Sequence, residues 1–323
     1  MSLPRAPAEP VGPDGPRFGT YRGTVERTAL AAGDRGATML TRWLREKQWQ
    51  YVAVADDRLA VGGAIVDAGL LGSPFWWALD RETGELRVDR SGVTLSPAIS
   101  HAETPTAGRQ ATVRWARDPI TIDRSAAQLT VTGSSGPLSL DLELLADPAE
   151  AATAICPVAG GHPAALNVTQ KEVTSAVSGS ATIGSRRHTF DGAVGLLDHT
   201  HGLLARETEW EWAMGCGEHD GSRIGFNLVS GFNDGLENVC WIGETVMELG
   251  AARFDQDEQC WRVRTADDRL DLTLDVEAER TENTDVGIVA SAYRQPIGAW
   301  SGTIDGRSVE GLYGVAEDHR ARW

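Results

Sequence analysis

The chain has 323 residues and a formal net charge of −16, with 30 Lys and Arg against 46 Asp and Glu. A field of this sign repels nucleic-acid phosphates and anionic lipid surfaces, and the Arg residues are scattered among acids instead of forming a basic patch. We therefore expect no nucleic-acid partner. With 41% hydrophobic and 24% charged residues, the composition is that of a globular protein long enough for two domains.

The first residues lack a basic segment followed by an apolar core, so no secretory signal is expected. The longest apolar region, 59–79, contains Asp67 and several glycines, which favours strands and a turn over a membrane span. The cysteines are widely spaced with no CxxC pair, and we expect buried free thiols. These features predict a cytoplasmic protein without membrane insertion.

Residues 1–20 hold five of the 14 prolines, which predicts a loosely ordered N-terminal arm. Residues 35–47 place Met39, Leu40, Trp43 and Leu44 at helical spacing, and this segment is the best helix candidate.

From residue 50 onward the pattern is that of strands. Short β-branched or aromatic runs alternate with turn formers, which is typical of a sandwich or barrel and not of βαβ units. The predicted strands of the first half are 50–55, 59–66, 75–79, 112–115, 120–123, 129–132 and 138–144. Those of the second half are 192–199, 206–217, 222–231, 236–243, 260–264, 269–277, 286–294 and 298–305.

The segment 147–150 (DPAE) interrupts the strand pattern, and we place a domain boundary there. The predicted fold class is all-β, with two β domains packed together. The N-terminal domain would span 21–150, and the C-terminal domain, 151–323, would carry the functional site.

The first candidate site segment is 195–202 (GLLDHTHG). If it is a strand, His199 and His201 point to one face and Asp198 to the other, together with Val194 and Leu196. A carboxyl group buried on an apolar face needs a partner or a raised pKa, as a general acid does. The alternative is an Asp that caps the turn around Gly202.

The next strand, 208–216, alternates cleanly. Trp210 and Trp212 share one face, and the neighbouring glutamates share the other. A core stripe is the simpler interpretation, although two indole rings on one face also suit the wall of an apolar pocket.

Asn227 lies inside an apolar strand, where Asn is disfavoured. Asn233, Asp234 and Gly235 form a hairpin-turn signal that explains these residues by itself. Glu237 and Asn238 open the return strand and could face the same space as Asn227.

The C-terminal segment 311–323 adds Glu317 and His319 and ends on Trp323. A solvated tail is the usual expectation for a terminus, and the terminal Trp indicates a docked one. His199 and His201, together with His319 or Glu317, would suffice for a zinc or iron site. The HxH pattern is a weak signal, however, and no Cys lies beside it.

Several long motifs resemble a bacterial family known as domain of unknown function 2804. They are KQWQYVAVADDRLAVGGAIVDAG, GLLDHTHG, ETEWEWAMGCG, GFNLVSGFNDGLENVCWIG, QPIGAWSG and GLYGVAEDHRARW. More distantly, 198–202 (DHTHG) is similar to an Asp-Arg/His-x-Trp-Gly strand motif of a lipocalin-like superfamily. That superfamily includes hydroxyneurosporene synthase (a carotenoid hydratase), tocopherol cyclase and kievitone hydratase-type proteins. In this chain His201 replaces the Trp of the motif.

The resemblance implies two lipocalin-like β domains and a pocket for a hydrophobic, often isoprenoid, molecule. It also implies a cofactor-independent lyase, hydratase or cyclase, with Asp198 as the acid and His199 or His201 as a proton relay. Trp210, Trp212, Asn227, Glu237, Asn238, Glu317 and His319 would then bind the substrate. Two alternatives remain open, namely a non-catalytic carrier of a hydrophobic ligand and a metal-dependent enzyme that uses the His-x-His strand.

Overall fold

The computed structural model describes residues 3–28, 30, 44–114, 119–158, 165–256, 260–285, 287 and 289–323. Most of these residues lie in antiparallel strands, which confirms the all-β prediction. The predicted helix at 35–47 lies largely outside the described residues. Its last two positions, Glu46 and Lys47, already belong to strand β4 (Glu46–Ala55), so a helix is wrong there.

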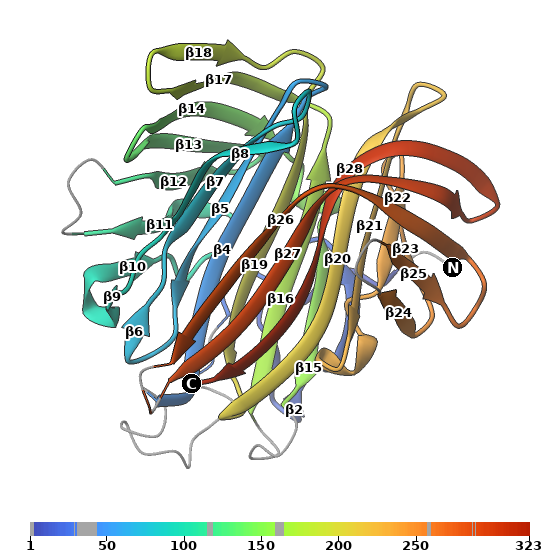
Figure 1. Ribbon diagram of the computed structural model, residues 1–323. Helices are drawn as coiled ribbons and strands as arrows, with labels where there is room; N and C mark the ends of the chain where they lie inside the picture. Colours follow the sequence, from blue (N-terminus) through green and yellow to red (C-terminus); the bar gives the residue numbers. More distant parts are fainter. Residues whose placement is uncertain are drawn as a thin grey trace.

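The central sheet has ten strands (Figure 1). Its order is β3 (Gly19–Arg22), β15 (Ala152–Pro157), β16 (Leu166–Thr174), β19 (Val194–Leu203), β4, β5 (Leu59–Asp67), β6 (Leu71–Gly72) and β9 (Thr94–Leu95). The remaining two, β7 (Phe75–Asp80) and β8 (Glu85–Ser91), extend from β5.

Two further sheets flank the central one. The 7-stranded sheet is ordered β10 (Ile99–His101), β11 (Ala107–Val113), β12 (Thr121–Ser125), β13 (Gln128–Ser135), β14 (Leu138–Leu145), β17 (Val177–Ile183) and β18 (Arg186–Thr189). The 9-stranded sheet is ordered β23 (Thr245–Glu248), β22 (Val239–Ile242), β21 (Ser222–Ser230), β20 (Glu207–His219), β28 (Arg307–Arg322), β27 (Ala290–Ile304), β26 (Leu270–Asp285), β25 (Trp261–Thr265) and β24 (Ala252–Gln256). A short ribbon of β1 (Val11–Gly12) and β2 (Gly15–Pro16) lies near the N-terminus.

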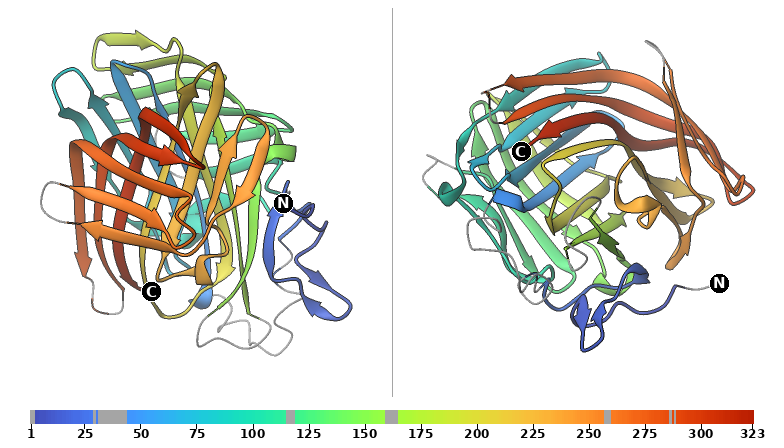
Figure 2. Two further views of the ribbon diagram at one scale, coloured as in Figure 1. Left: turned by 90° about the vertical axis from the view of Figure 1, so that its right-hand side faces the viewer. Right: turned by 90° about the horizontal axis from the view of Figure 1, so that it is seen from below.

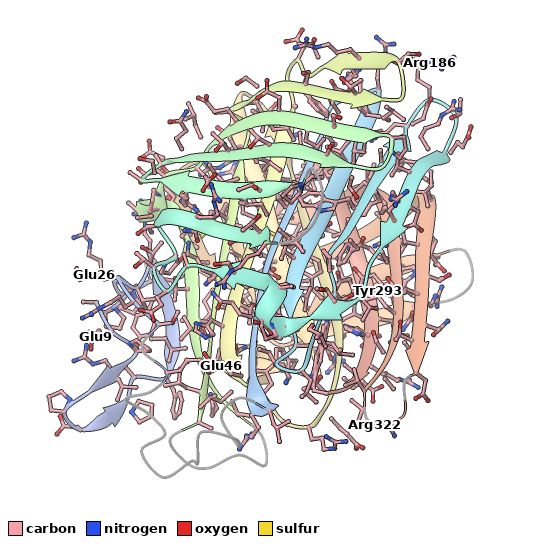
Figure 3. All side chains as sticks on the ribbon, turned by 90° about the vertical axis from the view of Figure 1, so that its left-hand side faces the viewer. Glu9, Glu26, Glu46, Arg186, Tyr293 and Arg322 are labelled. Atoms are coloured by element: carbon pink, nitrogen blue, oxygen red, sulfur yellow. The ribbon has the colours of Figure 1, made fainter. Side chains whose placement is uncertain are left out.

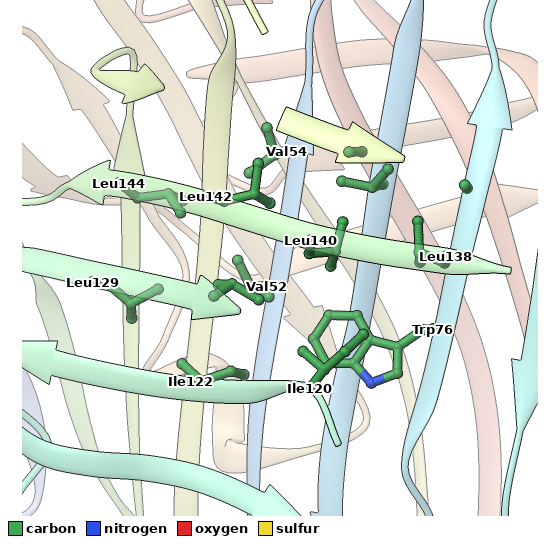
Figure 4. Close-up of a cluster of buried hydrophobic side chains, with 14 of the residues drawn as sticks. Val52, Val54, Trp76, Ile120, Ile122, Leu129, Leu138, Leu140, Leu142 and Leu144 are labelled. Carbon is green, nitrogen blue, oxygen red and sulfur yellow. The ribbon is translucent and has the colours of Figure 1, made fainter. Parts of the chain in front are cut away.

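The central sheet is covered on both faces (Figure 2). One face packs Val52, Val54 and Leu197 against the leucines of β14, whose strand runs across β4 in Figure 4. The other face packs Tyr51 and Leu196 against the 9-stranded sheet. Because both sides are covered, every residue of β16 and β19 is buried, polar ones included.

The 9-stranded sheet curls around a core of its own. Phe226 and Trp300 meet edge to face with ring centroids 5.4 Å apart, and Leu272 and Leu312 pack in the same cluster. The alternation of its strands therefore assigns one set of side chains to this inner core and the other set to the space beside the central sheet.

One pair of predicted strands needs correction, and β28 and β16 lie where no strand was predicted. Residues 286–294 and 298–305 were expected as two strands, but 290–304 form the single strand β27. The C-terminal segment is not a solvated tail, because it forms the 16-residue strand β28 between β20 and β27. β16 carries Gln, Lys and Glu in succession, so its sequence lacks the apolar run of a strand buried on both faces.

The boundary expected near residue 150 falls between β14 and β15. Strands from either side of it share the central sheet, since β4 and β5 precede it and β15, β16 and β19 follow it. The strand β3, at the end of the predicted arm, pairs with β15. The division into domains stays a prediction.

Candidate active site

A cavity of about 90 Å³ lies between the central sheet and the 9-stranded sheet. The cavity is the space that the side chains between these two sheets leave free. Its wall is mainly aromatic and apolar, but it contains one lysine and three carboxyl groups. These charged residues are Lys171, Asp198, Glu237 and Glu317.

Three polar residues form a row across the central sheet. Asp198 of β19 pairs in register with Lys171 of β16 on one side and with Tyr51 of β4 on the other. Side chains directly opposite one another on neighbouring strands share a face, so all three project into the cavity. The predicted orientation of Asp198, away from His199 and His201, is what the register produces.

Asp198 is surrounded by donors. Its Oδ1 lies 2.6 Å from Nζ of Lys171, and its Oδ2 accepts a hydrogen bond of 3.1 Å from Nε1 of Trp49. The hydroxyl of Thr200 also donates to Oδ1, at 3.3 Å. Charge-assisted donors of this kind stabilise an anionic carboxylate.

Lys171 has a second carboxylate partner. Its Nζ lies 3.0 Å from Oε2 of Glu237, and Oε1 of Glu237 accepts a hydrogen bond from the side chain of Asn233. Burial alone lowers the pKa of a lysine, but the charges of Asp198 and Glu237 outweigh it, so the pKa of Lys171 is raised. Lys171 is therefore a fixed cation, 5.4 Å from the ring centre of Trp212.

Glu317 of β28 is a carboxyl group whose pKa is raised toward neutral pH. Its Oε1 accepts hydrogen bonds from Tyr293 at 2.5 Å and from Gln295 at 2.9 Å, and its Oε2 accepts one from Trp210 at 3.3 Å. Burial raises its pKa, the bonds from Tyr293 and Trp210 oppose that rise, and the charge of Asp198 adds to it. The net effect is a pKa of about 7, which leaves both protonation states populated at neutral pH.

The facing sheet contributes a second row, Trp210, His319 and Tyr293, paired in register across β20, β28 and β27. The ring centroids of Trp210 and His319 are 4.3 Å apart, and Trp49 stacks with Trp210 at a centroid distance of 6.2 Å. His319 bonds Oγ of Ser291 through Nε2 at 2.8 Å, and burial lowers its pKa to about 3. The imidazole is therefore neutral at physiological pH.

Two predicted catalytic residues lie elsewhere. His199 and His201 occupy the opposite face of β19 and do not line the cavity. Nδ1 of His199 lies 3.2 Å from Oε1 of Gln50, whereas His201 contacts the Thr28 hydroxyl and Glu46. Because alternate residues of a strand face opposite ways, the structure does not bring either imidazole to Asp198.

The two asparagines also stand behind the cavity wall. Asn227 accepts a bond of 2.8 Å from Nε1 of Trp212 and donates one of 2.8 Å to the Glu237 carbonyl. Asn238 bonds the backbone of Val229 and Gly250. The structure therefore brings Asp198, Trp210, Trp212, Glu237, Glu317 and His319 to the cavity, and places the asparagines in support of it.

Sequence analysis missed Lys171, Tyr51, Trp49 and Tyr293. Trp49 and Tyr51 stand two apart in a strand pattern, which assigns them to one face. Lys171 gave no comparable signal, because its partners Asp198 and Glu237 are 27 and 66 residues further along the chain.

Within the described ranges, no cluster of three or more His, Cys, Asp or Glu side chains has an arrangement that could hold a metal ion. Over the same part of the chain, no helix has the length and apolar character needed to cross a membrane.

The fold has solved counterparts. Kievitone hydratase from Nectria haematococca superposes with a TM-score of 0.55 over 93% of this chain and 97% of that one, at 15% identity. CghA with Sch210972 gives 0.53 over 99% and 98%, at 11% identity. These identities establish a shared fold alone. A search of curated proteins found no match.

The sequence itself identifies the family. A family model matches residues 13–323, which is nearly the whole chain, as the motifs around Asp198 and Glu317 implied. The chain belongs to the family described as Domain of unknown function (DUF2804).

Proposed function

We propose that this protein is a cofactor-independent hydratase, lyase or cyclase that acts on a hydrophobic small molecule in the cavity between the central and 9-stranded sheets. The observation that carries the proposal is the pair of unlike carboxyl groups in one aromatic chamber. Asp198 is ion-paired with Lys171, and Glu317 is held by neutral donors only. Environments that separate two carboxyl groups in this way favour acid and base roles.

Glu317 is the proposed general acid. Its pKa of about 7 matches a group that must hold a proton and also release it at neutral pH. Asp198 is less suited to that role, because its carboxylate is already the partner of a cation. The assignment of the acid therefore moves from Asp198 to Glu317, with Asp198 retained in the reaction as an anion.

In a hydration, the proton of Glu317 adds to one carbon of a double bond and a cation develops on the other. The oxygen of a water molecule then bonds to the cationic carbon, and the proton that this water loses passes to a carboxylate. Dehydration is the same sequence reversed. In a cyclisation, a second double bond or a hydroxyl of the same molecule bonds to the cationic carbon instead of water, and the cation so formed loses a proton to a carboxylate.

The wall of the cavity suits a cationic intermediate. The rings of Trp210 and Trp212 line it, and a cation against an aromatic face gains about 2 kcal/mol or more when desolvated. Asp198 adds a fixed negative charge on the side of the central sheet. The fold shared with kievitone hydratase, as that protein is named, supports the reaction class by analogy.

The test combines ligand recovery with isotope labelling. The purified protein is extracted with organic solvent, and the recovered molecules are identified by mass spectrometry. They are then incubated with fresh protein in D₂O and, separately, in H₂¹⁸O. A hydratase incorporates ¹⁸O from the solvent, a lyase that dehydrates the ligand gives a product lighter by one water, and an enzyme that protonates an alkene incorporates deuterium.

We expect Glu317→Gln to reduce this incorporation at least 100-fold, because a positioned acid contributes about 10² to 10⁴ in rate. The matched control is Glu310→Gln, on the same strand but exposed, which should retain full incorporation. An unlabelled ligand that survives prolonged incubation with the wild-type protein would reject the enzyme and favour the carrier.

A further inference from the structure

A second cavity of about 110 Å³ lies directly beside the first. The two share five lining residues, Val66, Phe75, Tyr293, His319 and Trp323, which we call the partition. Tyr293 is labelled in Figure 3. A molecule that reaches from one cavity into the other must pass along these side chains.

The two cavities differ in chemistry. Lys171, Asp198, Glu237 and Glu317 line the first cavity and not the second. The second is lined largely by apolar side chains, among them Ala68, Leu71 and Val93, and its charged lining residue is Glu282. The reactive groups thus occupy one end of the pair, and the other end offers an environment for hydrocarbon.

An apolar rim marks the outer side of the second cavity. Val93 and Leu95 are 60% and 64% exposed, although most large apolar side chains among the described residues are buried. Val93 lines the second cavity, and Leu95 pairs in register with Leu71, another lining residue. Exposed apolar side chains gathered at the mouth of a cavity are typical of a site that admits an apolar ligand.

The first cavity also constrains the polar end of a ligand. It holds one lysine against the carboxylates of Asp198 and Glu237, so a further anion would be repelled. The Tyr51 hydroxyl is buried there without a hydrogen-bond partner among the described residues, and it can donate to a neutral oxygen.

We propose that the ligand is an elongated, neutral amphiphile, with its polar end in the first cavity and its apolar chain extending past the partition into the second. This inference rests on the proposed function for the location of the reacting end. It names the substrate class that the reaction would serve.

The test uses straight-chain 1-alkanols of 4 to 12 carbons as probes, with affinity measured by calorimetry. Burial of each further methylene should tighten binding about fourfold until the second cavity is filled, after which the affinity should level off. Alkyl carboxylates of matched length should bind at least tenfold more weakly. Undetectable binding of every alcohol, or equal affinity for alcohols and carboxylates, would overturn the inference.

Two variants fill the second cavity, one from the segment after β5 and one from β6. Ala68→Phe and Leu71→Trp should each abolish the gain in affinity for the longer alcohols and leave the shortest alcohols unaffected. The controls, Ala292→Phe and Leu145→Trp, alter exposed positions that line neither cavity, and should keep the full chain-length dependence.

Folding of each variant is checked by its melting temperature. If the gain with chain length persists in a folded Ala68→Phe or Leu71→Trp protein, the inference fails. Because the measurement is of binding alone, it stands apart from the proposed reaction. If the protein is inactive but still shows the chain-length dependence, the proposed ligand class stands and the proposed enzymatic function fails.

Discussion

Nζ of Lys171 lies 2.6 Å from Oδ1 of Asp198, and both side chains are less than 10% exposed. The carboxyl group expected to act as an acid is thus the partner of a buried cation. The same cation contacts Glu237, which lies in the turn between β21 and β22 of the facing sheet, so Lys171 links the central sheet to that turn across the cavity. Burying the charge of Lys171, Asp198 or Glu237 alone would cost free energy, and the opposite charges of the cluster offset that cost.

Removal of Lys171 should therefore destabilise the fold strongly. We expect Lys171→Met to lower the free energy of unfolding by about 3–5 kcal/mol, because two carboxylates stay buried without their cation. Urea unfolding at pH 7 measures this change. Adding Asp198→Asn to Lys171→Met should restore part of the loss, since one of the unpaired charges is then gone.

The control for Lys171 is Arg320→Met. Arg320 pairs with Glu209 at 2.9 Å, but these side chains are 68% and 65% exposed. Exposed pairs contribute about 0–1 kcal/mol, so Arg320→Met should change stability by no more than that. A loss below about 1 kcal/mol for Lys171→Met as well would show that the cluster does not carry buried charge.

The raised pKa of Glu317 predicts a pH-dependent stability difference. Between its ordinary pKa of 4.5 and about 7, the folded protein keeps a proton that the unfolded chain has released. Rising pH therefore disfavours folding through this group. The stability of the wild type relative to Glu317→Gln should fall by about 3 kcal/mol over this window.

Denaturation at a series of pH values from 4 to 8 gives that difference directly, since groups common to the two proteins cancel. Glu310→Gln, at an exposed position of the same strand, is measured in the same series as the control for the Glu→Gln change itself. A difference between wild type and Glu317→Gln that stays constant across the series would mean that the carboxyl of Glu317 titrates as an ordinary one.

Alternation along single strands predicted much of the site. The two faces of β19 and the shared face of Trp210 and Trp212 follow from a period of two, and the structure confirms them. The all-β class also follows from short runs and turn residues. These features are local, so one stretch of sequence contains all the information that they require.

The partners across strands were beyond the reach of that reasoning. Lys171 meets Asp198 because β16 and β19 pair in one register, and a shift of one residue would turn Lys171 to the other face. Registry between distant strands is set by the whole core. For the same reason the terminal Trp indicated that the C-terminal segment is docked but not that it forms a strand, since the pairing of β28 depends on β20 and β27.

Buried histidines predict sensitivity to acid. Burial lowers the pKa of His101 to about 3, and the nearby His201 lowers it further. From pH 6.5 down toward 3 the unfolded chain therefore takes up a proton that the folded protein refuses, and stability falls. Relative to the wild type, His101→Phe should become progressively more stable as the pH decreases through this range.

Chemical denaturation between pH 4 and 7.5 tests this expectation for His101→Phe. The control, His219→Phe, replaces a half-buried histidine beside the exposed Asp220, where the ring remains in contact with solvent. A pH trend found for His101→Phe and not for His219→Phe assigns the effect to the buried position and not to the loss of a histidine as such. Parallel curves for the wild type and His101→Phe would show that His101 is not the source of acid sensitivity.

Asn227 should matter through the side chain that it supports. In Asn227→Ala, Nε1 of Trp212 and the carbonyl of Glu237 each lose a hydrogen-bond partner in a buried setting, at a cost of about 1–3 kcal/mol per group. The control, Asn283→Ala, alters an exposed position on β26 and should stay within about 0.5 kcal/mol of the wild type. Asn227→Asp should not restore stability, because it keeps the acceptor for Trp212 but loses the donor to Glu237 and buries a charge. If Asn227→Ala were as stable as the wild type, packing alone would hold the indole of Trp212. Asn227 would then make no contribution to the stability of the cavity wall.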